Sequence, residues 1–164
     1  MKLSELAGAL AAKLKQRKAM IVFAESCTGG LASGELTKIP GISAHHCGSM
    51  VVYRETTKQQ YLGVSAKLLI EKGAVSEEVA QAMALGVLEK TPEATISAAV
   101  TGHLGPDAPK ELDGVVYMAC ALRGKGKAKP SCTVVKLQLS PNSQRVRRQQ
   151  LVIKSLYELC LETL

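Results

Sequence analysis

Residues 20–30, MIVFAESCTGG, decide the fold class of this chain. The first five are a continuous apolar run, which is typical of a strand buried on both faces of a sheet. Gly29 and Gly30 follow as a turn, and the next stretch predicts a helix over 31–38 that ends before Pro40. A strand that turns directly into a helix is the repeating unit of α/β proteins.

Predicted strands and helices alternate along the chain before and after this segment. Apolar residues at helical spacing, with polar residues between them, predict further helices. The last two strands, joined by a turn rich in glycine and lysine, predict a β-hairpin. We therefore expect one domain over residues 1–164, a three-layer α/β/α sandwich with a mixed β-sheet. The predicted helices are 3–15, 31–38, 55–62, 76–90 and one from 142 or 143 onward, and the predicted strands are 20–24, 50–53, 95–100, 114–122 and 131–139.

Apolar runs and cysteine spacing indicate the cellular compartment of the protein. No apolar run approaches the roughly 18 to 20 residues that span a bilayer, and the first residues do not resemble a signal peptide. The five cysteines are odd in number and widely spaced, which suits a reducing compartment. We therefore expect a cytoplasmic protein with no membrane partner.

The net charge of +7 raises the question of nucleic acid as a partner. The basic residues cluster only at 123–129, in a glycine-rich turn, and at 145–148. Aromatic residues, on which bases would stack, make up only 3% of the chain. A nucleic-acid partner is therefore disfavoured, and an anionic small substrate or a solvated basic face explains the charge better.

Three polar or glycine-rich loops, 25–30, 53–58 and 101–107, follow predicted strands. Ligands of α/β proteins collect at the carboxyl ends of strands, so we expect these loops to form the working site. Ser26 lies at a strand-to-helix turn, where it can act as a nucleophile or, with Thr28, simply cap the helix. Cys27 is a rival nucleophile, because a helix N-terminus lowers the pKa of a thiol.

The base that would activate Ser26 is less evident. None of the three histidines, His45, His46 and His103, has an obvious orienting carboxylate, so nothing supports a Ser-His-Asp triad. Adjacent residues such as His45 and His46 cannot easily face one ion, so no metal is expected. Lys58 can face the same cleft as Tyr53, but a lysine base must be neutral. Lowering its free pKa of about 10.4 by about three units costs about 4 kcal/mol.

Several motifs occur in a fixed order along the chain. The most specific of these motifs is AESCTGG at 24–30. The next are Tyr53-x4-Lys58 and the Leu-Gly-Val that follows it at 62–64. GAVSEEV at 73–79, Thr-Gly-x-x-Gly-Pro-Asp at 101–107 and Arg145-x-x-Arg148 complete the series. This arrangement resembles the CinA C-terminal domain family, the nicotinamide-nucleotide amidohydrolases, over almost the whole chain.

The resemblance implies an amidase that converts nicotinamide mononucleotide to nicotinic acid mononucleotide and ammonia. It implies Ser26 as the nucleophile, Lys58 as its base, and Tyr53 as an aid to proton transfer or to the placement of Lys58. It also implies a homodimer and no metal or organic cofactor. The substrate-binding residues that it implies are Glu25, Thr28, Gly29, Gly30, Thr101, Gly102, Gly105, Arg145 and Arg148. We add His103, because an imidazole in this loop can donate a hydrogen bond to substrate or hold an anion.

The third loop departs from the family pattern. His103 stands where the family carries an aliphatic residue, and Ala108-Pro109 stands where it carries a glycine pair. A loop that has lost this glycine pair has lost backbone freedom for cradling a phosphate. Two alternatives therefore stay open beside the nucleotide amidase. One is an amidase for a different small amide, and the other is a non-catalytic module that binds or senses a nucleotide.

Overall fold

A five-stranded mixed sheet forms the middle of the protein, which a computed structural model describes over all 164 residues. Its strand order is β2-β1-β3-β4-β5. Strand β1 pairs in parallel with β2 and β3, whereas β4 is antiparallel to both β3 and β5. The carboxyl ends of β1, β2 and β3 therefore meet at one edge. The strands are β1 (Ile21–Glu25), β2 (His46–Val51), β3 (Ile96–Gly102), β4 (Val115–Leu122) and β5 (Ser131–Gln138).

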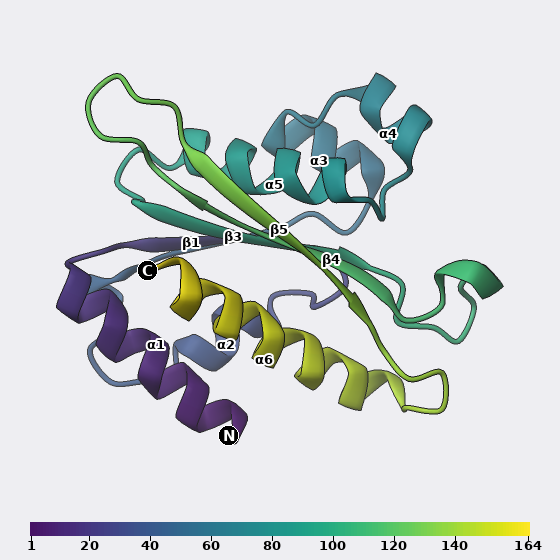
Figure 1. Cartoon of the computed structure of the whole chain (residues 1–164), viewed down its shortest axis with the longest axis horizontal. Helices are drawn as coiled ribbons and strands as arrows, with labels where there is room; N and C mark the ends of the chain where they lie inside the picture. Colours follow the sequence, from purple (N-terminus) through teal and green to yellow (C-terminus); the bar gives the residue numbers. More distant parts are fainter.

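Helices cover both faces of this sheet, which confirms the predicted fold class (Figure 1). Helices α1, α2 and α6 pack on one face around a core of 25 buried residues. Helices α3, α4 and α5 cover the other around a core of 16. None of the helices has the length and apolarity to span a membrane. The helices are α1 (Leu3–Arg17), α2 (Leu31–Leu36), α3 (Glu55–Leu62), α4 (Ala66–Lys72), α5 (Glu77–Lys90) and α6 (Arg145–Thr163).

The structure corrects some predicted boundaries. The second strand covers 46–51 rather than 50–53, because an edge strand need not be a continuous apolar run. Helix α4 was not predicted, although Ser65 caps it by accepting a hydrogen bond from the N–H of Leu68 at 3.0 Å. Helix α2 ends at 36, and α6 begins at 145 without a side-chain cap. The predicted hairpin is present as β4 and β5.

Candidate active site

The three loops that follow β1, β2 and β3 meet around one cleft. Its cavity has a volume of about 530 Å³. Residues from the turn after β1, from the start of α3, from the loop after β3 and from the first turn of α6 all reach it. The lining residues are Ser26, Cys27, Tyr53, Lys58, Ala74, Val75, Arg145 and the run from Thr101 to Ala108.

Ser26 and Lys58 are in direct contact in this cleft. The N–H of Ser26 donates to the carbonyl of Val100 at 3.1 Å, which anchors the serine to β3. Nζ of Lys58 lies 2.9 Å from Oγ of Ser26 and donates to the carbonyl of Val52 at 2.9 Å. Two residues that are 32 positions apart in the chain thus form a buried hydroxyl–amine pair.

Lys58 occupies a site that favours its neutral form. Its side chain comes from α3, and the residue is only 2% exposed. Burial lowers the pKa of this amine, because water no longer solvates the ammonium ion. None of the four ion pairs of the protein includes Lys58. A neutral amine can keep one N–H bond to Val52 and accept the hydroxyl hydrogen of Ser26.

Cys27 also lines the cleft, but its chemistry differs from that of Ser26. The thiol is buried, and this burial raises its pKa to about 12. Only the thiolate is a strong nucleophile, so at neutral pH Cys27 is almost entirely in its unreactive form. The helix N-terminus that could have activated this thiol does not offset its burial. The geometry therefore favours Ser26 over Cys27.

Glu25 closes the N-terminus of α2. This carboxylate is completely buried and accepts five hydrogen bonds from the chain itself. It binds the start of the helix and a side chain of β2, rather than facing the cleft, so the expectation that Glu25 contacts substrate does not fit this geometry. The donors are the hydroxyls of Thr28 and Ser49 and the N–H groups of Gly30, Ala32 and Ser33, at 2.6 to 3.0 Å.

The glycine turn is less available to a ligand than the sequence suggested. The N–H of Gly29 donates to the carbonyl of Ser26 at 3.0 Å, and that of Gly30 donates to Glu25. Thr28 is buried, and its hydroxyl is also bound to Glu25. None of Thr28, Gly29 and Gly30 lines the cavity. The N–H groups of Cys27 and Thr28, by contrast, donate to no atom of the protein.

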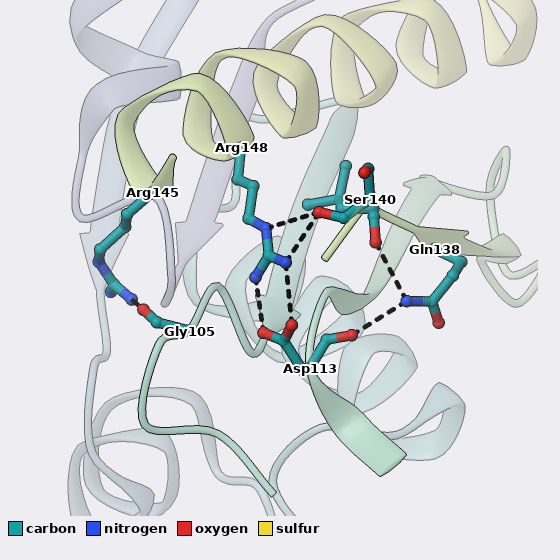
Figure 2. A network of polar contacts seen from close by, with 7 residues as sticks. Gly105, Asp113, Gln138, Ser140, Arg145 and Arg148 are labelled. Carbon is teal, nitrogen blue, oxygen red and sulfur yellow. Dashed lines mark hydrogen bonds and ion pairs between the residues drawn. The ribbon is translucent and has the colours of Figure 1, made fainter. Parts of the chain in front are cut away.

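Tyr53 lies at the mouth of the cleft and is 60% exposed. Its hydroxyl accepts a hydrogen bond from Nη2 of Arg145 at 3.0 Å, and it makes no hydrogen bond with Lys58. Nη1 of the same arginine donates to the carbonyl of Gly105 at 2.6 Å (Figure 2). Arg145 therefore connects the segment after β2 to the loop after β3. In this structure Tyr53 is placed by Arg145, rather than placing Lys58.

Arg148 has a different environment, one turn further along α6. It is only 2% exposed, and its guanidinium binds both carboxylate oxygens of Asp113, at 2.6 and 2.9 Å, and the carbonyl of Ser140 (Figure 2). This hydrogen-bonded pair lowers the pKa of the Asp113 carboxyl. Arg148 does not line the cleft that holds Ser26. It fixes the end of the loop after β3 to α6.

The three histidines have separate environments. Nδ1 of His45 lies 3.0 Å from the carbonyl of Ala19, and Nε2 of His46 lies 2.7 Å from Oγ of Ser33. The ring of His103 makes no hydrogen bond to the protein and lines the cleft, while its backbone is paired with 114 and 115. Nowhere do three side chains of His, Cys, Asp or Glu gather as a metal site would require.

A comparison with protein families and known structures places this architecture. The model of the CinA C-terminal domain matches residues 3–161, which is nearly the whole chain. The chain belongs to the CinA C-terminal domain family. A CinA-like protein of Chlorobium chlorochromatii is 39% identical over 144 residues, which are 87% of this chain and 33% of that protein. A CinA-like protein of Geotalea uraniireducens is 54% identical over 101 residues, 60% of this chain and 24% of that protein.

Solved structures agree with this assignment. The competence/damage inducible protein CihA of Agrobacterium tumefaciens is 31% identical and superimposes with a TM-score of 0.90, covering 98% of this chain and 94% of that one. A CinA superfamily protein of Escherichia coli gives a TM-score of 0.90 at 25% identity, covering 99% of this chain and 91% of that one. The chain spans about a third or less of the length of the curated relatives named above, so it corresponds to one part of those proteins.

Sequence reasoning missed some residues of the site. Ala74 and Val75 line the cavity, although only their motif at 73–79 was noted. Asp113 was not identified as the partner of Arg148, because the two are 35 positions apart and no local pattern pairs them. A buried arginine almost always has a partner, but the loop before β4 offers three carboxylates, Asp107, Glu111 and Asp113, and the sequence does not choose between them.

Proposed function

We propose that this protein hydrolyses the amide of nicotinamide mononucleotide, with Ser26 as the nucleophile and Lys58 as its base. The observation that carries this proposal is the buried 2.9 Å contact between Oγ of Ser26 and Nζ of Lys58. A nucleophile within hydrogen-bond reach of a base with a lowered pKa is the usual arrangement for acyl transfer. Membership of the CinA C-terminal domain family supports the choice of substrate.

The reaction follows from this contact. Oγ of Ser26 forms a bond to the amide carbon while its proton passes to the neutral amine of Lys58. The carbon–nitrogen bond then breaks, the leaving nitrogen takes the proton from Lys58, and ammonia departs. Water next attacks the Ser26 ester, gives its proton to Lys58, and frees the carboxylic acid as the proton returns to Oγ.

Stabilisation of the oxyanion in this scheme requires donors beside Ser26. The N–H groups of Cys27 and Thr28 directly follow the nucleophile in the chain and donate to no protein atom. Backbone donors of this kind stabilise the charge that develops on the carbonyl oxygen. We assign this task to the N–H of Cys27, which lines the cleft, rather than to Thr28, which does not, or to Gly29 and Gly30, whose N–H groups are already bound.

The remaining wall of the cleft would bind the rest of the substrate. Thr101, Gly102, His103, Gly105 and Arg145 all line it. Arg145 has no acidic partner, and the ring of His103 is unbound, so both can donate to an anionic group. We assign substrate contacts to these five residues and structural contacts to Glu25, Thr28 and Arg148.

Two further features belong to this proposal. A cytoplasmic location is supported by five cysteines that form no disulfide. The family resemblance suggests a homodimer, which light scattering on the purified chain would measure. No cofactor takes part in the proposed steps.

The direct test is ammonia release from nicotinamide mononucleotide by the purified chain. Replacing Ser26 with Ala should abolish turnover, by about 10³-fold or more, because the covalent path is lost. Cys27→Ala is the matched control in the neighbouring position and should keep most of the activity. Tight binding without turnover in the unmodified protein would instead favour a nucleotide-binding module. An inactive Cys27→Ala beside an active Ser26→Ala would overturn the assigned nucleophile.

A further inference from the structure

A second cavity lies beside the cleft, and the two share part of their lining. The second has a volume of about 390 Å³ and is bordered by the first turn of α6 and the loop after β3. Leu104, Pro106 and Arg145 line both cavities. These three residues therefore form the boundary between the nucleophile's cleft and the space next to it.

Arg145 is the part of this boundary that hydrogen bonds to two neutral groups hold in place. Leu104 is buried, whereas the Arg145 side chain is exposed and is held only by the carbonyl of Gly105 and the hydroxyl of Tyr53. Both acceptors are neutral, and no carboxylate lies within ion-pair distance of this guanidinium. The position of the guanidinium on this boundary therefore depends on its two hydrogen bonds, to Gly105 and to Tyr53.

An ion pair holds the far wall of the second cavity in place. Arg148 and Asp113 line it, and their two-pronged ion pair together with the Ser140 carbonyl holds the arginine in place (Figure 2). The other polar residues there are Ser143 and Gln144, neither of which carries a charge. The second cavity thus offers a polar space that anionic or hydroxyl-rich groups could enter from the cleft.

We propose that Arg145 is a specificity-determining partition that limits the amide substrate to the length of one nucleotide. A mononucleotide amide needs only the cleft that contains Ser26. A dinucleotide with the same nicotinamide group carries a second nucleotide, which would have to extend past Arg145 into the second cavity. The guanidinium, bound to Gly105 and Tyr53, lies on the boundary that the two cavities share. This inference rests on the proposed function for its choice of substrate.

The test compares nicotinamide mononucleotide with nicotinamide adenine dinucleotide. Replacing Arg145 with Ala should raise the kcat/KM of the dinucleotide relative to that of the mononucleotide by about tenfold or more, because it joins the two cavities. Arg145→Lys keeps a long cationic side chain at the boundary and should retain most of the discrimination. Arg147→Ala is the matched control, since it removes the same charge from the same helical turn but lines neither cavity.

Binding separates this inference from the proposed function. The dissociation constants of both nucleotides are measured by calorimetry on Ser26→Ala and on the double variant with Arg145→Ala. A selective gain in dinucleotide binding in the double variant supports the partition even if the unmodified protein releases no ammonia, a result that would end only the proposed function. An unchanged binding ratio, or equal use of both nucleotides by the unmodified protein, would overturn the partition.

Discussion

At the scale of single residues, the site depends on the cost of burying an amine. Lys58 is 2% exposed and has no acidic partner, so its charged form is poorly solvated. The protein offsets part of this cost with the carbonyl of Val52 and the hydroxyl of Ser26. Cys27, buried beside them, is shifted toward its neutral and unreactive form. The same burial therefore activates one side chain and silences the other.

The lowered pKa of Lys58 predicts how turnover depends on pH. The pKa of Lys58 is lowered, so the fraction of neutral base increases as pH rises through that pKa and is complete above it. Activity should therefore rise with pH to a plateau and be lost on the acidic side. Lys58→Arg should be inactive at every pH, because guanidinium stays protonated. Rates of ammonia release between pH 5 and pH 10 measure both effects, and an active Lys58→Arg enzyme would remove Lys58 from the role of base.

At the scale of elements, the turn from β1 into α2 depends on one carboxylate. Helix α2 has only six residues, too few to be stable by itself, and Glu25 satisfies the N–H groups at its start. The same carboxylate binds Ser49 of β2, so it joins strand, turn and neighbouring strand in one buried contact. The position of Ser26 follows from this arrangement.

Replacing Glu25 with Gln should therefore destabilise the protein by at least about 2 kcal/mol, because one amide oxygen cannot accept five hydrogen bonds and the amide nitrogen would face other donors. Glu35→Gln is the control within the same helix, where the carboxylate binds only the exposed Lys38, and it should change stability by less than about 1 kcal/mol. Urea unfolding of both variants measures the difference. Equal midpoints would show that the Glu25 contacts contribute little.

The elements also show what a sequence can predict. The segment after residue 20 and helix α5, capped by Ser76, were predictable because apolar runs and caps are local signals. Strand β2 was misplaced, since its polar start carries no strand pattern. The convergence of loops 25–30, 53–58 and 101–107 on one cleft was also predictable, because each follows a strand of an α/β sheet. The contact between Tyr53 and Arg145 joins residues 92 positions apart and depends on how α6 packs, so no local pattern contains it.

At the scale of the whole molecule, the proposed catalytic dyad of Ser26 and Lys58 joins the two layers of helices. Ser26 directly follows strand β1, and Cys27 beside it belongs to the larger core. Lys58 comes from α3, which lies on the opposite face of the sheet with α5 and the smaller core. The 2.9 Å contact therefore exists only when both cores are packed against the same sheet.

Both cores should consequently unfold together and carry activity with them. Leu14, in the larger core, and Leu88, in the smaller, are each almost completely buried. Either leucine changed to Ala should cost about 2 to 5 kcal/mol through lost contacts and a cavity. In urea, circular dichroism and ammonia release should be lost in one coincident transition for each variant, with an unchanged slope, as two-state unfolding requires. If Leu88→Ala lost activity at a lower urea concentration than its helical signal, the layer that holds Lys58 would be an independent unit, and the dyad would open before the fold does.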